Sequence, residues 1–389
     1  MDKDSRANQI IKRMSKLYLN SLYGFLLFLL FSVSNAYSQD ASPVLKTQYL
    51  SLSKDEIQKL VSLIKTDQSA EKNYQSLKSL ASISLQQQPN PIDTIISEGH
   101  LANDPKKIIT QKALADLPKI YALAYTYRIS NQKIYLKKCI EYIIAWARTN
   151  HGVGNPINDT KLDPLLEAYD LIKDEFATNE KEIVTGWLTQ LADAEISHPR
   201  FKSAKRSVYN NWNSHRIKVV ANIAYVLNNK EHQAFADTSI KTQILKNLYA
   251  DGSGIDFEDR DALHYHIYTL EPLLKTAILI KRATGVNYFA YISPSGSSIQ
   301  KSVEFLIPFA TGEKKHQEFV NSKTPFDKKR AENKEPGYAI GNNFDPETAI
   351  EVLSYAAYFQ PDYSSIVKKL MAATDNYVNW QLVLNRVRN

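Results

Sequence analysis

The chain has 389 residues, 43% of them hydrophobic, with a single cysteine and a formal net charge of +7 at pH 7. One thiol cannot form an internal disulfide, so the fold must depend on its hydrophobic core. The mild positive charge suits an acidic partner. Without a dense basic stripe, however, it argues against a nucleic-acid-binding protein.

The first 36 residues indicate a secretory signal peptide. Their apolar run, residues 24–31, is too short to span a bilayer as a helix. Basic residues precede this run, and Ser34–Ala36 follows as a small-x-small cleavage pattern. An uncleaved membrane anchor is the alternative. No cysteine lies near the cleavage site, so we expect no lipid anchor, no membrane contact after cleavage, and a periplasmic or secreted protein.

Removal of residues 1–36 leaves 43 basic and 39 acidic residues, a net charge of +4. Helical periodicity then recurs along nearly the whole chain, which favours one all-α domain over residues 37–389. Predicted helices cover 54–66, 70–87, 112–129, 131–149, 161–175, 179–197, 208–228, 232–248, 261–284, 297–310, 346–359 and 363–388, the last broken near 374. The best strand candidate is short, residues 48–52. Stacked helical hairpins of this kind form an α/α toroid or an α-solenoid, and no fixed repeat period favours a regular array.

The helix predicted over 208–228 carries a polar stripe on an otherwise apolar surface. At 100° per residue the stripe contains Asn211, Ser214, His215, Lys218, Asn222 and Tyr225. A solvent-facing side of an ordinary amphipathic helix is the alternative, but such faces usually carry both signs of charge, and this one has no acid. Amide and imidazole donors on a rigid helix suit recognition of a carboxylate. Arg216 projects among the apolar residues and does not fit the pattern.

A second segment, residues 251–268, indicates a turn that leads into a helix beginning near Asp261. Tyr265 projects almost opposite the leucines of this helix, and Arg260 lies just before its start. His266 sits beside the leucine stripe and is interpreted as a packed core histidine. The segment therefore places a tyrosine and an arginine together, away from the helix's own apolar face.

These residues resemble a known family. Asn210-Asn211 at a helix start, followed some fifty residues later by the run from Arg260 to Leu273, is similar to the pattern of alginate lyases. The resemblance extends from about Gly99 to Leu274 and includes 154–170. Family members usually carry histidine directly after the Asn pair, where this chain has Trp212. His215 lies one turn later on the Asn211 face and can restore an imidazole to the site.

The resemblance implies an incomplete α/α toroid that cleaves an acidic polysaccharide, a polyuronate, by β-elimination. Asn211 and His215 are assigned to neutralising the uronate carboxylate, with assistance from Arg260. Tyr265 is the implied base at C5 and acid toward the leaving oxygen, and a nearby guanidinium favours its phenolate form. The predicted substrate-binding residues are Asn158, Lys161, Trp212, His264 and Tyr268. Lys161 as a surface lysine and the aromatic residues as core are the alternatives.

One tyrosine can serve both steps only if H5 and the C4 oxygen share one face of the sugar. That geometry fits mannuronate and glucuronate, whereas for guluronate His215 is the better base. The residue pattern leaves the choice among these uronates, endo or exo action, and the oligomeric state open.

Three other functions compete with this interpretation. An essential metal is disfavoured, because His264-x-His266 lacks zinc-ligand spacing and no cysteine cluster exists, so no metal or cofactor is expected. A helical glycoside hydrolase needs two carboxylates, for which Asp256, Glu258, Asp259 and Asp261 are available. A non-catalytic glycan-binding protein is the third, although the absent cleavage-site cysteine argues against a lipid-anchored one.

Overall fold

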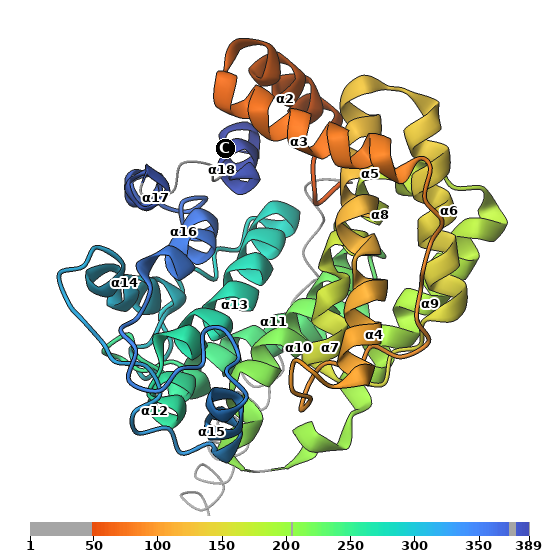
Figure 1. Cartoon of the computed structure of the whole chain (residues 1–389). Helices are drawn as coiled ribbons and strands as arrows, with labels where there is room; N and C mark the ends of the chain where they lie inside the picture. Colours follow the sequence, from red (N-terminus) through yellow and green to blue (C-terminus); the bar gives the residue numbers. More distant parts are fainter. Residues whose placement is uncertain (1–48, 204, 373–378, 389) are drawn as a thin grey trace, which may run out of the picture. The chain divides into compact units, whose positions relative to one another are not determined.

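The computed structural model describes residues 49–203, 205–372 and 379–388, all within one compact unit (Figure 1). The predicted signal peptide, residues 1–36, lies outside the described residues. The α-helices are α2 (Lys54–Thr66), α3 (Gln68–Ser84), α4 (Pro105–Leu114), α5 (Asp116–Ser130), α6 (Lys133–Thr149), α7 (Pro156–Asp159), α8 (Asp163–Ile172), α9 (Thr178–Ser197), α10 (Asn211–Val226), α11 (Lys230–Asn247), α12 (Ile255–Arg260), α13 (Leu263–Thr284), α14 (Ile299–Ala310), α15 (Pro325–Glu332), α16 (Ile350–Ala356), α17 (Tyr363–Ala372) and α18 (Trp380–Arg388). Short 3-10 helices are η1 (Thr160–Leu162), η2 (Lys173–Glu175), η3 (Pro199–Lys202), η4 (Arg206–Tyr209) and η5 (Pro346–Ala349).

The helices pack as hairpins around an inner succession. Within it α5, α8, α10, α13 and α16 each contact the next helix in that order. The helices α6, α9, α11, α14 and α17 pack on these from outside, and α18 contacts α16, α2 and α3 (Figure 1). This arrangement is the predicted α/α toroid. One hydrophobic cluster of buried side chains runs from Leu50 to Val387 and holds the hairpins together.

No strand occurs in the described ranges, which contain only two isolated β-bridges. The short strand expected at residues 48–52 is therefore not formed over Tyr49–Leu52. No helix in the described part of the chain combines the length and the apolar composition needed to cross a membrane.

Local capping explains several helix boundaries. Ser53 begins α2 with a capping box: its hydroxyl accepts from the Glu56 amide at 3.2 Å, and the Glu56 carboxylate accepts from the Ser53 amide at 2.7 Å. The single helix predicted over 112–129 is wrong, because α4 ends at Leu114 and α5 begins at Asp116. Pro118 has no amide hydrogen to donate to the Leu114 carbonyl, so one continuous helix is unfavourable there.

Two helices near the site were not predicted. Helix α12 precedes Asp261, whose φ of 47° breaks the chain direction before α13 begins at Leu263. The Glu318 carboxylate then caps α13 from far along the chain, accepting from the amides of Leu263 at 2.9 Å and His264 at 3.0 Å. Helix α15 lies in the same segment as Glu318, residues 311–349, which connects α14 to α16.

Candidate functional site

Helix α10 is buried almost all round, and its predicted polar stripe divides between two sets of neighbours. Ser214 and Tyr225 face α11, where they bond Gln243 and Asp237. The other side of the stripe faces α8 and α13 and carries His215, Lys218 and Asn222. The stripe therefore faces the interior rather than solvent, but only part of it contributes to one site.

His215 is the most unusual group on this face. It is 1% exposed, its Nδ1 lies 2.9 Å from the Thr160 hydroxyl, and its Nε2 has no hydrogen-bond partner. Its ring packs against Tyr268 with centroids 4.3 Å apart. Burial, reinforced by the charge of Lys218, lowers the pKa of His215 to about 3. The imidazole is therefore neutral at physiological pH and has one ring nitrogen left for another molecule.

Tyr265 and Tyr268 lie side by side on α13, their rings 6.1 Å apart and perpendicular. Tyr265 is only 5% exposed, because Phe319 and Tyr338 of the 311–349 segment pack against it. Tyr268 is half-buried and its hydroxyl bonds no described residue. Burial raises the pKa of both phenols, a shift that the arginines beside Tyr265 oppose.

Arg260 lies beside Tyr265, as predicted, but over its ring rather than at its hydroxyl. The guanidinium carbon is 3.5 Å from the ring centroid. Both Nε and Nη2 of Arg260 donate to the carboxylate of Asp327, which is 1% exposed. The hydroxyl of Tyr265 accepts from Arg330 instead, at 2.7 Å. The cation at the Tyr265 hydroxyl is therefore Arg330, whereas the sequence indicated Arg260.

Asn211 is held by a buried carboxylate. Its backbone amide and its side-chain Nδ2 donate to the same oxygen of Asp256, at 3.0 and 2.5 Å. The other oxygen of Asp256 accepts from Asn247 at 2.9 Å and Thr269 at 2.6 Å. Asp256 thereby joins the start of α10 to α11, α12 and α13, and Asn211 reaches the predicted site with one of its two amide hydrogens already committed.

The predicted binding residues Asn158 and Lys161 lie where the chain enters α8. Asn158 is buried, and its Oδ1 accepts from the amides of Ser97 and Glu98 at 3.1 and 3.0 Å, which fixes the loop ahead of α4. Lys161 is half-buried and forms no ion pair with any described residue. Its pKa is lowered by burial and by the nearby charges of Lys218 and Lys107. Lys161 therefore lies near His215 with no ion-pair partner among the described residues.

The two other predicted binding residues flank this group. Trp212 is half-buried at the start of α10, with the Arg200 guanidinium 4.0 Å from its ring. His264 lies at the start of α13, where its Nε2 is 3.3 Å from the Tyr338 hydroxyl. Burial, with the charges of Arg330 and Arg260, lowers the pKa of His264 to about 4. The structure thus brings His264, Tyr265, Tyr268 and His215 into one chain of aromatic contacts.

Arg216, which the stripe did not explain, has a structural role. Its Nε and Nη2 donate to the carbonyls of Glu195 and Ile196 at 2.8 and 2.9 Å, at the last turn of α9.

Two buried carboxyl groups lie beneath the site and were not singled out. Asp159, next to Thr160 in the chain, is 3% exposed, and Glu195 of α9 is 0% exposed. Burial raises the pKa of Asp159 to about 7 and, together with the charge of Asp159, that of Glu195 to about 9. Gly154 precedes Asp159 and packs closely on the end of α9. Its φ is 70°, and a Cβ at this position would lie 2.4 Å from the Ala194 carbonyl oxygen, so only glycine fits there.

One turn beyond His215, the same helix face carries a network of paired charges. Lys218, 2% exposed, contacts Asp163 and lies 3.6 Å from Glu271. Lys275 contacts the same two carboxylates at 3.3 and 2.9 Å, and Asn222 donates to Asp163 at 3.0 Å. Although burial opposes it, the charges of Lys218 and Lys275 hold the pKa of Glu271 well below its ordinary value.

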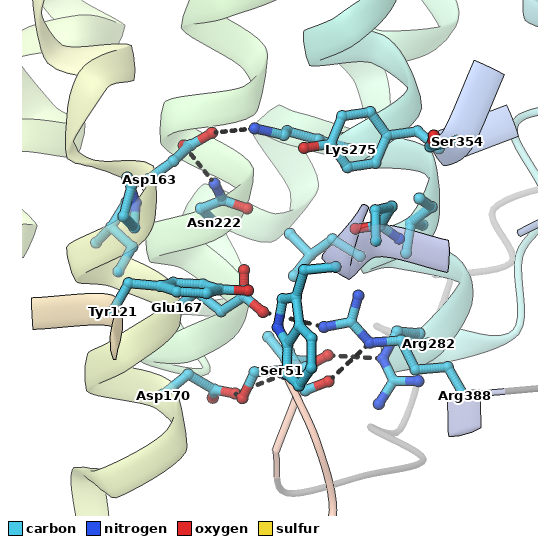
Figure 2. A pocket seen from close by; sticks show the side chains of 18 of the residues that line it. Ser51, Tyr121, Asp163, Glu167, Asp170, Asn222, Lys275, Arg282, Ser354 and Arg388 are labelled. Atoms are coloured by element: carbon cyan, nitrogen blue, oxygen red, sulfur yellow. Dashed lines mark hydrogen bonds and ion pairs between the residues drawn. The ribbon is translucent and has the colours of Figure 1, made fainter. Parts of the chain in front are cut away.

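A cavity of about 530 Å³ lies beyond this network. Figure 2 shows Asp163, Asn222 and Lys275 at one side of it and Arg282 and Arg388 at another. Its cations are already paired, Arg282 with Glu56 at 2.8 Å and Arg388 with Glu167 at 3.1 Å. The cavity therefore offers no unpaired cation to an acidic ligand, unlike the His215 region.

The carboxylates that a hydrolase would need are engaged elsewhere. Asp256 is the buried hub described above, and Glu258 and Asp259 pair with Arg206 at 2.6 and 3.0 Å. Asp261 accepts from both nitrogens of Asn321. In the part of the chain that the structure describes, no group of three or more His, Cys, Asp or Glu side chains is placed to hold a metal ion.

Arg330 and Tyr338 are the site residues that sequence reasoning missed. Both come from the 311–349 segment, in which α15 has no apolar periodicity that would have indicated a helix packed on the site. Pro336, Gly337 and Gly341 indicate a loop in this segment, but no local signal ties it to α13.

The chain is similar to a known protein family and to several solved structures. The alginate lyase family model matches residues 61–316. A solved alginate lyase from Bacteroides ovatus has a TM-score of 0.65 at 17% identity, covering 89% of this chain and 100% of its own. Alginate lyase A1-III from Sphingomonas species A1 has a TM-score of 0.57 at 16% identity, covering 84% of this chain and 92% of its own. A tyrosine-to-phenylalanine variant of alginate lyase A1-III, complexed with a tetrasaccharide, gives 0.54 at 18% identity, covering 72% and 82%. The comparison with curated protein sequences gives no match.

Proposed function

Since the chain belongs to the alginate lyase family and is a polysaccharide lyase, we propose that it cleaves a 1,4-linked polyuronate by β-elimination at the His215–Tyr268 contact. In this reaction a base removes the proton from C5, the C4–O bond breaks, and a C4–C5 double bond forms while the leaving oxygen takes up a proton. Negative charge develops on the C5 carboxylate, so donors must be aimed at it. The observation that carries the proposal is the buried, partnerless Nε2 of His215 beside a half-buried tyrosine.

His215 serves as a neutral donor to that carboxylate. When the Thr160 hydroxyl donates to Nδ1, the ring proton resides on Nε2, which has no acceptor in the described part of the chain. Lys161 supplies positive charge nearby, since its charge acts on His215 and it forms no ion pair with a described carboxylate. Asn211 has one amide hydrogen left beside its bond to Asp256 and contributes it to the same carboxylate.

Of the two tyrosines, Tyr268 is the better placed for proton transfer. It contacts His215 directly, and its hydroxyl bonds none of the residues that the structure describes, whereas the hydroxyl of the buried Tyr265 accepts from Arg330. Tyr265, the base expected from the sequence, then supports Tyr268 through their perpendicular ring contact. A general base must reach the proton that it removes, and exposure favours Tyr268 in this respect.

The substrate class follows from using one tyrosine for both steps. Mannuronate and glucuronate place H5 and the C4 oxygen on the same face, so polymannuronate or glucuronan is the proposed substrate. The tetrasaccharide bound by alginate lyase A1-III supports an oligosaccharide ligand for this fold. Export through the signal peptide predicted over residues 1–36 belongs to the same proposal.

The test is an ultraviolet assay of the purified protein on polymannuronate, polyguluronate, glucuronan, hyaluronan, chondroitin and pectate. We expect absorbance from the new C4–C5 double bond, with the highest rate on polymannuronate or glucuronan. Reducing ends that appear without this absorbance would indicate hydrolysis. Binding to a polymer with no product on any substrate would indicate a glycan-binding protein instead.

A further inference from the structure

Arg260 and Arg330 stand on either side of Tyr265, and their hydrogen bonds differ. Arg260 uses Nε and Nη2, one full edge of its guanidinium, on the carboxylate of Asp327. Asp327 is buried and accepts also from the Ser322 hydroxyl at 2.5 Å. The charge of Arg260 is therefore matched by a fixed counter-ion, and the Tyr265 ring covers one of its faces.

Arg330 has no hydrogen-bonded carboxylate among the described residues, only an ion pair with Glu335. Its Nη1 donates both hydrogens to phenols, to Tyr265 at 2.7 Å and to Tyr338 at 3.0 Å. Its Nε is buried without a hydrogen-bond partner. The nearest acid, Glu335, is 3.7 Å from Nε, longer than a hydrogen bond, and its Oε1 accepts from the Ala102 amide at 2.7 Å.

A mostly buried guanidinium with an unused donor edge is costly in a folded protein unless a ligand completes it. The Nε and Nη2 edge of arginine matches the two oxygens of a carboxylate. Its position is set from one side by the bond to Tyr265, which lies beside Tyr268. An acidic sugar whose C5 faces the tyrosine pair brings its carboxylate toward this edge.

We infer that Arg330, rather than Arg260, is the guanidinium that recognises the uronate carboxylate, and that Arg260 is a positioning residue that holds α12, α15 and Tyr265 in place through Asp327. This inference rests on the proposed function for the identity of the sugar. It makes α15 a specificity element of the site, supplied by a segment 65 residues beyond Tyr265 in the chain.

The experiment measures binding of a saturated mannuronate tetrasaccharide by titration calorimetry to the full-length Tyr268→Phe protein. In this background the variants are Arg330→Gln, Arg330→Lys and, as a control on the exposed side of α15, Lys329→Gln. A second ligand, the same tetrasaccharide with its carboxylates methyl-esterified, separates charge recognition from shape. Melting temperatures verify that each variant is folded.

We expect Arg330→Gln to weaken binding of the acid tetrasaccharide at least tenfold, Arg330→Lys to recover part of it, and Lys329→Gln to change nothing. The affinity for the methyl-esterified tetrasaccharide should be the same with Arg330→Gln as with Arg330 retained. Unchanged affinity of Arg330→Gln for the acid form, or an equal loss for acid and ester, would overturn the inference. A different result separates the two proposals. If Arg330→Gln weakens binding of the acid tetrasaccharide but the protein without substitutions forms no unsaturated product, the proposed function fails while the inference on Arg330 holds.

Discussion

The contact between α10 and α13 has two regions, one helical turn apart, which differ in whether their polar groups are paired. At His215 and Tyr268 a ring nitrogen and a hydroxyl have no hydrogen-bond partner among the described residues. At Lys218 every charge is matched, by Asp163 and Glu271 and through them by Lys275. Both regions lie in the interior, so burial alone does not distinguish a reactive site from a structural one. The difference lies in which groups remain unpaired.

Replacing His215 with alanine breaks the first region and should give the largest effect. A positioned acid–base or donor group typically contributes roughly 10²–10⁴-fold to the rate, so kcat on the best polyuronate should fall by about that factor. The melting temperature should also fall, because the substitution removes the Nδ1 bond to Thr160 and the ring contact with Tyr268, but the protein should remain folded under assay conditions. Initial rates of double-bond formation and thermal melts of both proteins measure this; a large loss of stability with full specific activity would reverse the roles of the two regions.

Replacing Lys218 with methionine breaks the second region and should act on stability. Two half-buried carboxylates would lose the buried one of their two cations, and removal of one partner of a buried ion pair typically costs about 3–5 kcal/mol. Lys275 still pairs with both acids, so we expect the lower end of that range in urea denaturation. A Lys218→Met protein that unfolds at the parental urea concentration would show that the network is not structural.

The carboxyl pair beneath the site should limit stability at alkaline pH. The folded-state pKa values of Asp159 and Glu195 are about 7 and about 9, above those of unfolded carboxyl groups. The folded protein therefore holds protons that the unfolded chain has released, and stability falls as pH rises from about 4 toward 9. Glu195→Gln should raise the melting temperature at pH 9 by about 2 °C or more relative to the parent. At pH 5 the two proteins should melt alike, and an equal shift at both pH values would contradict the assignment.

Removal of a surface ion pair should have the smallest effect on stability and serves as the reference for the other substitutions. Arg386 contacts Asp67 at 2.7 Å, but its side chain is 51% exposed. Exposed pairs contribute about 0–1 kcal/mol, so Arg386→Gln should lower the free energy of unfolding by less than about 1 kcal/mol. A larger loss in the same urea assay would indicate that α18 depends on this contact for docking.

The fold was within reach of the sequence because its signals are local. Helical periodicity recurs through nearly every hairpin, and the Ser53 cap lies three residues from its partner Glu56. Helix α15 was missed because its eight residues, rich in charge, have no apolar stripe. Its position depends on contacts with Arg260 and Tyr265, 67 and 65 residues away.

The sequence indicated which residues form the site, but not which hydrogen bonds and ion pairs they make. Helical projection placed Asn211 and His215 on one face, and the motif placed Arg260 beside Tyr265. No projection shows that Asn211 bonds Asp256, 45 residues away, or that Asp327 neutralises Arg260. Pairing of this kind is set by tertiary structure. It decides which of several plausible donors is left for a substrate.

The most direct test of the claim that unpaired groups at the α10–α13 contact carry the chemistry is the rate of Tyr268→Phe beside Tyr265→Phe. Both remove one hydroxyl from the same helix, and both are assayed by double-bond formation on polymannuronate or glucuronan. We predict a loss of at least about 100-fold for Tyr268→Phe at an unchanged melting temperature, and a smaller loss for Tyr265→Phe. A near-parental rate for Tyr268→Phe would contradict the account and return the proton transfer to Tyr265.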